Sequence, residues 1–348
     1  MSNVKYIYWF TYYNLDAPSV RYRAKYPLNF FKKNYGVKST LIIPGYDRKR
    51  MFSFIKSYCS ALFFRKEKSV IVIQRVHSNF IYSTLLKLLV IVRKKDTVYD
   101  LDDADYLYCR PNSIYFFAKK CARLSLGSQE ISNHLSRFNS TILITTSPTP
   151  DMKIIKQKKS DIFTIGWVGG FAGDHKKSMI EIVFPAINQL NFECKFILLG
   201  VTHAKDEEFV KKYFNKNKNI QLEIPAKINW LNEAELQHKI MSFDIGIATL
   251  IDNEIQRSKS GIKAKQYLNN GVPVLGTDLP ENNRVIKNEI NGFFCSNTKE
   301  FHQRIVEFHE MSDEQYSSFL KNARDSIKEF NLEKYYADFI LFDKSNDG

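Results

Sequence analysis

The fold of this chain is decided by GIKAKQYLNNGVPVLGT, the stretch from Gly261 to Thr277. Its first part reads as a helix that ends at Gly271, and Pro273 prevents the helix from continuing. Residues 272–275 are apolar, β-branched and too few for another helix, which predicts a buried interior strand. Lys263 lies in the first turn of the helix, where the exposed amides and the helix dipole favour a bound anion such as a diphosphate.

The composition indicates a globular protein of two domains with an anionic partner. A chain of 348 residues is long for one hydrophobic core, and 44% hydrophobic and 14% aromatic residues exclude disorder. The formal net charge of +14 favours a nucleic acid, an acidic membrane surface or a phosphorylated substrate. Because the basic residues are scattered and form no RNA-binding motif, nucleic acid is the least favoured, and we expect no such partner.

The cysteines and apolar runs predict a cytoplasmic protein that is soluble or peripheral to a membrane. The five cysteines are odd in number and include no CxxC pair, which is typical of reduced cytosolic thiols. The first residues lack the features of a signal peptide, and the longest apolar run, residues 85–92, is too short to span a membrane. The seven histidines show no HExxH or paired spacing, so we expect no metal site.

Strand-like and helix-like stretches alternate along the chain, which predicts an α/β fold with parallel sheets. Residues 145–160 contain two prolines and no periodicity, and they read as a linker between two doubly wound domains. The domains would span residues 1–150 and 160–330. The expected strands are 4–10, 38–43, 69–73, 97–101, one at Leu124, 140–144, 162–168, 195–199, 220–223, 243–248, 272–275 and 292–294.

Two stretches of the second domain suit an anionic ligand. The strand expected before Gly169 runs into GGFAGDHKKS, and glycines after a parallel strand let backbone amides approach an anion. Gly169 and Gly170 are therefore candidates, although such a turn is also common without a ligand. Arg257, Lys259 and Lys263 form a set of cations near a helix start, which suits a nucleoside-diphosphate leaving group. For Lys259 alone, a solvated basic face is the stronger alternative.

Three carboxylates follow one expected strand of the first domain, in YDLDDADYLY (residues 99–108). Asp100, Asp102 and Asp103 would lie at the carboxyl end of this strand, where open α/β sheets place their ligands. Such a cluster can hold a metal, accept a proton from a hydroxyl or bind sugar hydroxyls. The alternative is a loop in which each aspartate caps backbone amides.

Two further segments of the first domain are basic. Arg21 and Arg23 lie near an expected helix start, where they reach the acceptor or the donor phosphates, or stay on an exposed helix face. Residues 48–68 form an expected helix with seven Lys or Arg, and its phenylalanines are Phe52, Phe54, Phe63 and Phe64. A basic, aromatic helix either lies in the headgroup region of an anionic membrane or buries its aromatic face in the core.

Together these segments resemble GT-B fold glycosyltransferases of the large retaining family. The resemblance is carried by GWVGG, by FDIGIATLIDNEIQRSKSGIKAKQYLNNGVPVLGT and by YDLDD. It implies two Rossmann-like domains facing a cleft: an acceptor domain at 1–150, a nucleotide-sugar domain at 160–330, and a last helix, about 331–348, that crosses back to the first domain. The residues that would bind the donor are Gly169, Gly170, Lys177, Glu254, Lys259, Gly261 and Gln266, and those that would serve the chemistry are Asp102, Asp103, Arg257 and Lys263.

The chain departs from the family pattern at several positions. The usual arginine of the glycine turn is missing, and the spacing leaves Lys176 as an alternative to Lys177. The family's two glutamates, eight positions apart, match Ser258 and Gln266, of which Gln266 still offers an amide to ribose hydroxyls. DxD metal sites belong to a different glycosyltransferase fold, so the resemblance implies no required metal or cofactor.

The resemblance implies transfer of a sugar from a nucleoside-diphosphate sugar to a glycan or lipid-linked acceptor, with retention at the anomeric carbon. Synthesis of cell-surface polysaccharide or lipopolysaccharide at the inner face of the plasma membrane is the usual role of such relatives, and the positive charge fits it. Two alternatives stay open. One is a GT-B fold sugar-nucleotide epimerase, which needs no acceptor, and the other is a basic nucleic-acid-binding protein.

Overall fold

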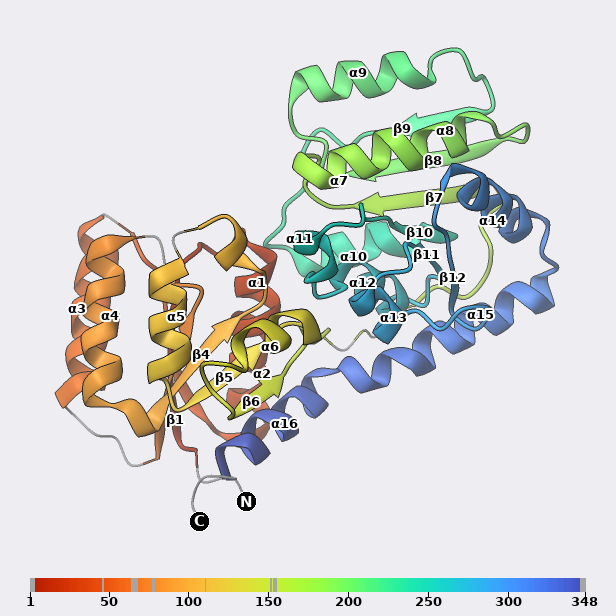
Figure 1. The fold of residues 1–348 in the computed structure, drawn as a ribbon. Coiled ribbons are helices and arrows are strands. Elements are labelled where there is room, and N and C mark those ends of the chain that lie inside the picture. Colours follow the sequence, from red (N-terminus) through yellow and green to blue (C-terminus); the bar gives the residue numbers. More distant parts are fainter. Residues whose placement is uncertain are drawn as a thin grey trace. The chain divides into compact units, whose positions relative to one another are not determined.

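The computed structural model describes residues 4–45, 47–63, 68–76, 79–109, 111–150, 152 and 155–344, with side chains up to Phe339. The chain forms two compact units (Figure 1). Unit 1 comprises Met1–Pro150, Ser258–Ser260 and Phe330–Gly348, and unit 2 comprises Asp151–Arg257 and Gly261–Glu329. Phe64, in the expected basic helix, lies outside the described residues.

Unit 1 is built on a parallel sheet of six strands in the order β2-β1-β3-β4-β5-β6. The strands are β1 (Tyr6–Thr11), β2 (Lys38–Ile42), β3 (Ser69–Gln74), β4 (Thr97–Leu101), β5 (Arg123–Leu126) and β6 (Ile142–Ile144). The chain runs from β1 outwards to β2 and then returns past β1 to β3, so the strand order reverses between β1 and β3. In open parallel sheets, ligands bind at the carboxyl ends of the strands beside such a reversal.

Helices cover both faces of this sheet. They are α1 (Pro18–Val20), α2 (Tyr26–Tyr35), α3 (Arg48–Phe63), α4 (Phe80–Val92), α5 (Pro111–Lys120), α6 (Gln129–Leu135) and α16 (Leu332–Lys344). On one face, Phe31 of α2 and Phe339 of α16 share a core with Trp9. On the other, α3 to α6 share a core with Phe10 and Tyr99. Because successive residues of β1 point to opposite faces and both faces are covered, its residues from Ile7 to Phe10 are all large and apolar.

Unit 2 repeats this architecture with the strand order β12-β11-β10-β7-β8-β9, again all parallel. The strands are β7 (Phe163–Val168), β8 (Cys194–Leu199), β9 (Ile220–Glu223), β10 (Ile245–Ala248), β11 (Val274–Gly276) and β12 (Gly292–Phe294). The helices are α7 (Gly173–Ser178), α8 (Phe184–Asn188), α9 (Ala204–Phe214), α10 (Glu233–Met241), α11 (Glu254–Arg257), α12 (Ile262–Asn269), α13 (Pro280–Val285), α14 (Thr298–Glu310) and α15 (Asp313–Ser326). Here the strand order reverses between β7 and β10.

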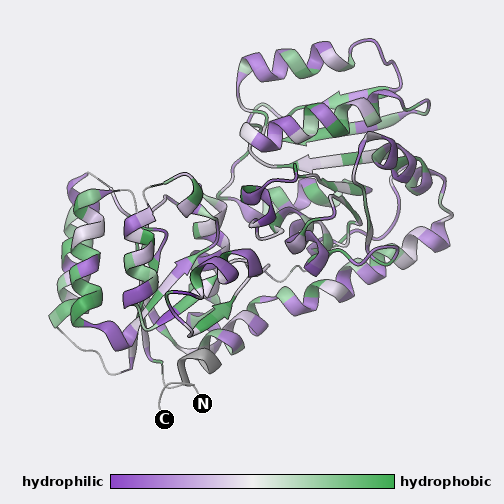
Figure 2. Cartoon of the chain, viewed as in Figure 1, coloured by the Kyte–Doolittle hydropathy of each residue, from purple (hydrophilic) through white to green (hydrophobic). Residues whose placement is uncertain are grey.

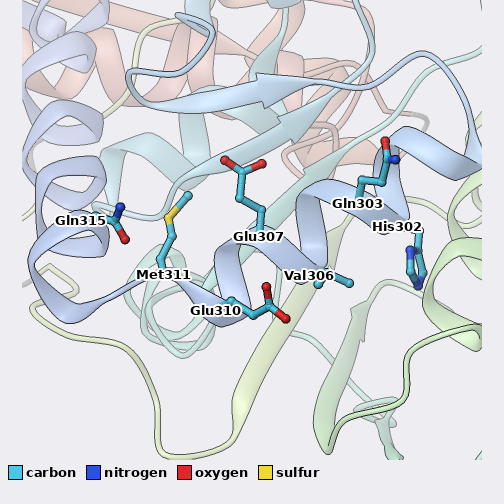
Figure 3. A pocket seen from close by; sticks show the side chains of 7 residues that line it. All are labelled: His302, Gln303, Val306, Glu307, Glu310, Met311 and Gln315. Carbon is cyan, nitrogen blue, oxygen red and sulfur yellow. The ribbon is translucent and has the colours of Figure 1, made fainter.

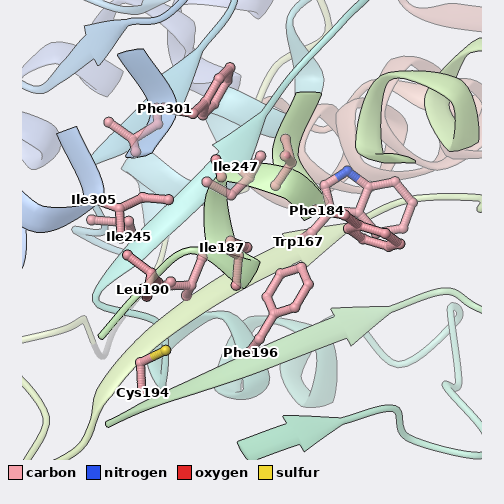
Figure 4. Packing of buried hydrophobic residues seen from close by; sticks show 14 of the residues in the cluster. Trp167, Phe184, Ile187, Leu190, Cys194, Phe196, Ile245, Ile247, Phe301 and Ile305 are labelled. Atoms are coloured by element: carbon pink, nitrogen blue, oxygen red, sulfur yellow. The ribbon is translucent and has the colours of Figure 1, made fainter. Parts of the chain in front are cut away.

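The core of unit 2 fixes the position of β7. Figure 4 shows Trp167 of this strand beside Phe184 of α8 and Phe196 of β8, with Phe301 and Ile305 of α14 in the same cluster. All five side chains are fully buried. Because protein interiors are close-packed, this environment holds the end of β7, and the turn that follows it, in one place.

The helix that follows the first strand of each unit contains a wide π turn directly before a proline. In unit 1 the turn spans Arg21–Lys25 and precedes Pro27, and in unit 2 it spans Met179–Val183 and precedes Pro185. A proline has no N–H, and its ring collides with the carbonyl four residues earlier, so the wider turn relieves the clash. The sequence predicts neither turn.

The predicted α/β fold with two doubly wound parallel sheets is confirmed. Each expected strand is present, with ends that differ by no more than two residues. The sequence does not predict α5, and it also misses α11 and α13, which at four and six residues are too short to show a helical period.

Candidate functional site

A glycine turn ends β7 beside the strand reversal of unit 2. The N–H of Gly169 donates to the carbonyl of Leu199 at 2.9 Å. Gly200 (φ 124°) lies so close that a Cβ there would come within 1.9 Å of the Gly169 carbonyl oxygen, so only glycine fits. A Cβ on Gly170 would meet no atom of the described residues within 4 Å. The turn therefore combines a tightly packed residue with one that borders open space, where a ligand can approach the backbone.

Lys263 extends from the start of α12 to this turn. Its Cε would lie 2.8 Å from a Cβ at Gly169, which is closer than two carbons approach, so the glycine leaves the room that the lysine occupies. Its Nζ lies 3.2 Å from Nε2 and 3.4 Å from Nδ1 of His175 in α7. Gly261 precedes the helix in the left-handed conformation (φ 61°). The structure thus brings together Gly169 and Lys263, which the sequence singles out, and adds His175, which it does not.

The loop between β10 and α12 is tied to α7 through Asp174. Its Oδ2 accepts hydrogen bonds from Nδ2 of Asn253 at 2.9 Å and from Nε2 of Gln256 at 3.2 Å. Gln256 is 5% exposed, and its Oε1 has no hydrogen-bond partner among the residues that the structure describes. A buried acceptor oxygen without a hydrogen bond lowers the stability of the fold unless a ligand or a water donates to it. Gln256 is therefore a candidate contact that local sequence does not reveal.

Arg257 and Glu254 lie in the short helix α11. Both are exposed. Arg257 donates two hydrogen bonds to Asp252, from Nε at 2.5 Å and from a terminal nitrogen at 2.8 Å. Its charge is therefore shared with a carboxylate and screened by water, which weakens the predicted set of cations.

The other donor candidates differ in burial. Lys177 is exposed on α7, whereas the alternative, Lys176, pairs with Asp206 at 2.6 Å. This pairing favours Lys177 for contact with a ligand. Gln266 is 6% exposed and lies three residues after Lys263 on α12, so the two residues share one side of the helix.

In unit 1, candidate groups gather at the carboxyl ends of β3 and β4, beside the strand reversal. Arg75 directly follows β3 in a left-handed conformation (φ 55°), which is costly for a long side chain. It donates to both carboxylate oxygens of Asp105, at 2.8 and 2.6 Å, and to Asp103 at 2.9 Å, and it lies 3.4 Å from Asp102. Lys259, which belongs to this unit, lies 2.9 Å from Asp103. The sequence singles out Asp102 and Asp103, but neither Asp105 nor Arg75, which joins the three aspartates.

The adjacent aspartates of this cluster differ in proton affinity. Burial raises the pKa of Asp102 to about 6, against the opposing attraction of Arg75. Burial acts on Asp103 in the same direction, but Arg75 and Lys259 outweigh it and hold the pKa of Asp103 well below its usual range. One carboxylate therefore stays charged while its neighbour exchanges a proton close to neutral pH, which is the pattern of an acid–base pair. Within the described ranges, no group of three or more His, Cys, Asp or Glu is arranged to hold a metal ion.

Both expectations for Arg21 and Arg23, contact with the acceptor or donor phosphates and a place on an exposed helix face, are wrong because the two side chains are buried. Their exposed fractions are only 1% and 0%. Arg23 donates to the two carboxylate oxygens of Asp100, at 2.9 and 2.5 Å, and to the carbonyl of Thr145. Arg21 donates to two carbonyls of the preceding loop, at 3.0 and 2.6 Å. Asp100 is therefore part of a structural ion pair inside unit 1.

A hollow of about 450 Å³ runs along α14 and the beginning of α15 in unit 2 (Figure 3). It is lined by His302, Gln303, Val306, Glu307, Glu310, Met311 and Gln315. The lining holds two glutamates and neither lysine nor arginine. Because like charges repel, this hollow does not suit a diphosphate.

Two doubly wound parallel sheets, each with candidate groups at the carboxyl ends of its strands, are the architecture of GT-B glycosyltransferases. Residues 162–311 match the family model described as "Glycosyl transferases group 1". The matched segment includes the glycine turn, His175 and Lys263. The match covers less than half of the chain, and it shows that this part of unit 2 is similar to a glycosyltransferase domain. No curated protein matches the chain in sequence.

Solved structures of glycosyltransferases share the fold over almost the whole chain. A glycosyltransferase from Rickettsia africae has a TM-score of 0.69 at 13% identity, covering 99% of this chain and 100% of its own. Anabaena HepE, in complex with UDP and glucose, has a TM-score of 0.65 at 11% identity, covering 96% and 99%. The lipopolysaccharide outer core galactosyltransferase WaaB has a TM-score of 0.62 at 12% identity, covering 97% and 99%. At these identities the similarity establishes the fold alone.

Proposed function

We propose that this chain transfers a sugar from a nucleoside-diphosphate sugar to a glycan or lipid-linked acceptor. The observation that carries the proposal is the meeting of Gly169, His175 and Lys263, which come from three elements of a glycosyltransferase domain. The amides after β7 and the ammonium of Lys263 suit a diphosphate, whose charge grows as the glycosidic bond breaks. Unit 2 would bind the donor and unit 1 the acceptor.

The remaining donor contacts that we propose are Gly170, Lys177, Glu254, Arg257, Gly261 and Gln266. Lys259, a donor candidate from the sequence, belongs to unit 1 and pairs with Asp103, so we assign it to that cluster. We propose retention at the anomeric carbon, because a front-face reaction depends on stabilising the leaving group more than on a side-chain nucleophile. The groups assigned to the diphosphate are backbone amides and cations, which suits that requirement. An epimerase would instead change or release the nucleotide sugar without any acceptor, so product analysis with and without acceptor separates the two reactions.

Uridine diphosphate is the nucleotide we propose, because Anabaena HepE, which shares the fold, was solved with UDP. The test is the thermal unfolding of the full chain with UDP, GDP, ADP and dTDP. A ligand at 100 times its Kd stabilises a protein by about 2.7 kcal/mol, so UDP is expected to raise Tm by several degrees. The absence of a shift with every nucleoside diphosphate would contradict the donor site.

The same measurement tests Gln266. Gln266→Ala is expected to weaken UDP binding roughly 3- to 10-fold, as for the loss of a neutral hydrogen bond, and to change kcat less. Gln303→Ala, in the hollow along α14, is the matched control and is expected to leave UDP affinity unchanged. Equal affinities in wild type and Gln266→Ala would remove the ribose contact from the proposal.

We propose that Asp102 and Asp103 serve the acceptor or the transferred sugar. Asp102→Asn and Asp103→Asn are each expected to lower kcat at least about 10-fold, with UDP affinity near wild type. Since the pKa of Asp102 is about 6, its carboxylate forms as the pH rises through this value. Activity that needs this carboxylate rises over the same range, and Asp102→Asn is expected to lose this pH dependence. Wild-type turnover in both variants would show that the two aspartates have a structural role and take no part in the reaction.

We further propose a cytoplasmic protein that acts at the inner face of the plasma membrane, in the synthesis of cell-surface polysaccharide or lipopolysaccharide. Two observations support this. WaaB, which shares the fold, acts in the outer core of lipopolysaccharide according to its name. The formal net charge of +14 favours an anionic surface. Radiolabel transfer from UDP-sugars to membrane extracts tests the acceptor class.

A further inference from the structure

Helices α3 and α4 of unit 1 expose large apolar side chains that the proposed reaction does not use. On α4, Phe80, Ile81 and Ile91 are 83%, 71% and 61% exposed. On α3, Phe52 and Ile55 are 69% and 54% exposed. With Leu88, these residues are here called the α3–α4 face. Side chains of this size are seldom so exposed together unless the surface has a partner.

The outer side of α4 is largely apolar, with Thr84 as its exposed polar residue among those that the structure describes. Ile81, Leu88 and Ile91 follow one another at helical spacing and are all exposed. Leu86 and Leu89, on the inner side, are fully buried in the core. The helix therefore carries large apolar residues on two sides, and among the described residues the inner side is the one that packs into a core.

The outward sides of α3 and α4 belong to one surface. These helices connect β2 to β3 and β3 to β4, which are steps in the same direction across the sheet, so right-handed connections place both helices on one face. Tyr58 of α3 donates to the carbonyl of Leu85 in α4 at 3.0 Å, and the rings of Phe54 and Tyr82 lie 4.9 Å apart. Figure 2 shows the two helices side by side, with hydrophobic residues along both.

Positive charge surrounds this surface. From Arg48 to Lys95 the sequence contains 12 lysines or arginines and one acidic residue, Glu67. Exposed basic residues begin α3, at positions 48–50, and follow the end of α4, at Lys94 and Lys95. The apolar residues therefore lie between two groups of cations.

We propose that the α3–α4 face docks on an anionic lipid bilayer. Its apolar side chains would enter the boundary between headgroups and acyl chains, and its lysines and arginines would pair with lipid phosphates. α4 has 13 residues and a length of about 20 Å, and no helix in the described part of the chain is long and apolar enough to cross a membrane. The helices would therefore lie in the plane of the interface.

The positive charge around the α3–α4 face argues against a second copy of this chain and against another protein as the partner. A second copy of this chain, related by a two-fold axis, would set the cations of one face against those of the other. A protein partner is less suited because protein interfaces are depleted in lysine, whereas lysines beside a membrane extend their amines to the headgroups. The proposal needs no part of the donor chemistry, so each can fail alone.

The test is sedimentation of the full chain with vesicles of phosphatidylcholine alone or mixed with phosphatidylglycerol. We expect binding to the mixed vesicles that weakens with salt, because surface attraction is screened within about 8 Å at physiological ionic strength. Phe80→Ser/Ile81→Ser is expected to lower the partition coefficient roughly tenfold or more through lost apolar contact. Lys94→Glu/Lys95→Glu is expected to lower it by a similar factor through charge.

Matched controls come from α9 of unit 2, which exposes the same residue types. Phe209→Ser and Lys205→Glu/Lys212→Glu are expected to bind vesicles like wild type. No binding to either vesicle, equal binding to both, or wild-type binding by Phe80→Ser/Ile81→Ser would overturn the proposal. So would a dimer, seen by light scattering, that this variant abolishes while vesicle binding persists. The UDP-induced Tm shift in the same variant is expected to stay at its wild-type value, which separates loss of docking from loss of the donor site.

Discussion

Replacement of Lys263 by alanine is expected to lower kcat by about 10²-fold or more, with a smaller change in UDP affinity. The ammonium lies at the start of α12 and against the Gly169 turn, where the amides and the helix dipole already favour an anion. Because negative charge builds on the diphosphate as the sugar leaves, a fixed cation there stabilises the transition state more than the bound substrate. Steady-state kinetics with a UDP-sugar, together with UDP titration, measures both quantities.

The controls for this variant test charge and position separately. Lys263→Arg keeps the charge but carries a larger head into the space that Gly169 leaves, so only partial activity is expected. Arg257→Ala is expected to have a smaller effect because this arginine is exposed and paired with Asp252, and its effect should combine less than additively with that of Lys263→Ala. Lys212→Ala, exposed on α9, is expected to be neutral. Wild-type turnover in Lys263→Ala would mean that the donor site lies elsewhere.

Replacement of Arg23 by leucine is expected to destabilise unit 1 by about 3–5 kcal/mol. The exposed fraction of both side chains in the Arg23–Asp100 pair is 0%, so the substitution leaves a buried carboxylate without its cation. It also removes donors from Ser125 and Thr145. Urea unfolding measures the loss, and hydrogen exchange in β4 assigns it to unit 1 because Asp100 lies in that strand.

A second substitution distinguishes loss of the ion pair from loss of volume. Arg23→Leu alone leaves the buried Asp100 carboxylate without a cation. The double variant Arg23→Leu/Asp100→Asn removes this charge, so it is expected to recover part of the stability. Arg50→Leu breaks an exposed pair with Asp47 and is expected to cost less than about 1 kcal/mol. Equal stability of Arg23→Leu and Arg50→Leu would show that the buried pair contributes no more than a surface pair.

The strands could be predicted from the sequence because a buried parallel strand has a local signature. Their order in each sheet could not, because it depends on pairing between segments that are distant in the chain. Gly169 and Lys263 could also be found, since each belongs to a motif that is continuous in the chain. His175, Gln256 and Arg75 could not, because their roles depend on contacts between distant segments. Arg75 lies 30 residues from Asp105, and only the folded sheet places the two together.

The wrong predictions for Arg21 and Arg23 have the same cause, which is that local sequence does not show contacts between distant segments. Arg21 and Arg23 look like surface residues because local sequence gives an arginine no reason to be buried. For Arg23 the reason is its ion pair with Asp100, which is 77 residues away in the chain. Arg257 likewise looks available to a ligand until the structure places Asp252 against it.

Unit 1 is formed by segments from both ends of the chain, so it can be completed only when the last segment has been synthesised. Phe330, where its last segment begins, follows Pro150 by 180 residues. At roughly 5–20 residues per second, translation of that interval takes about 9–36 s. Until then the sheet face around Trp9 lacks the side chains of α16, whereas unit 2 has been made in full. Unit 2 is therefore expected to fold first on the ribosome. During the delay, the apolar sheet face of unit 1 stays exposed, and we expect chaperones to bind it.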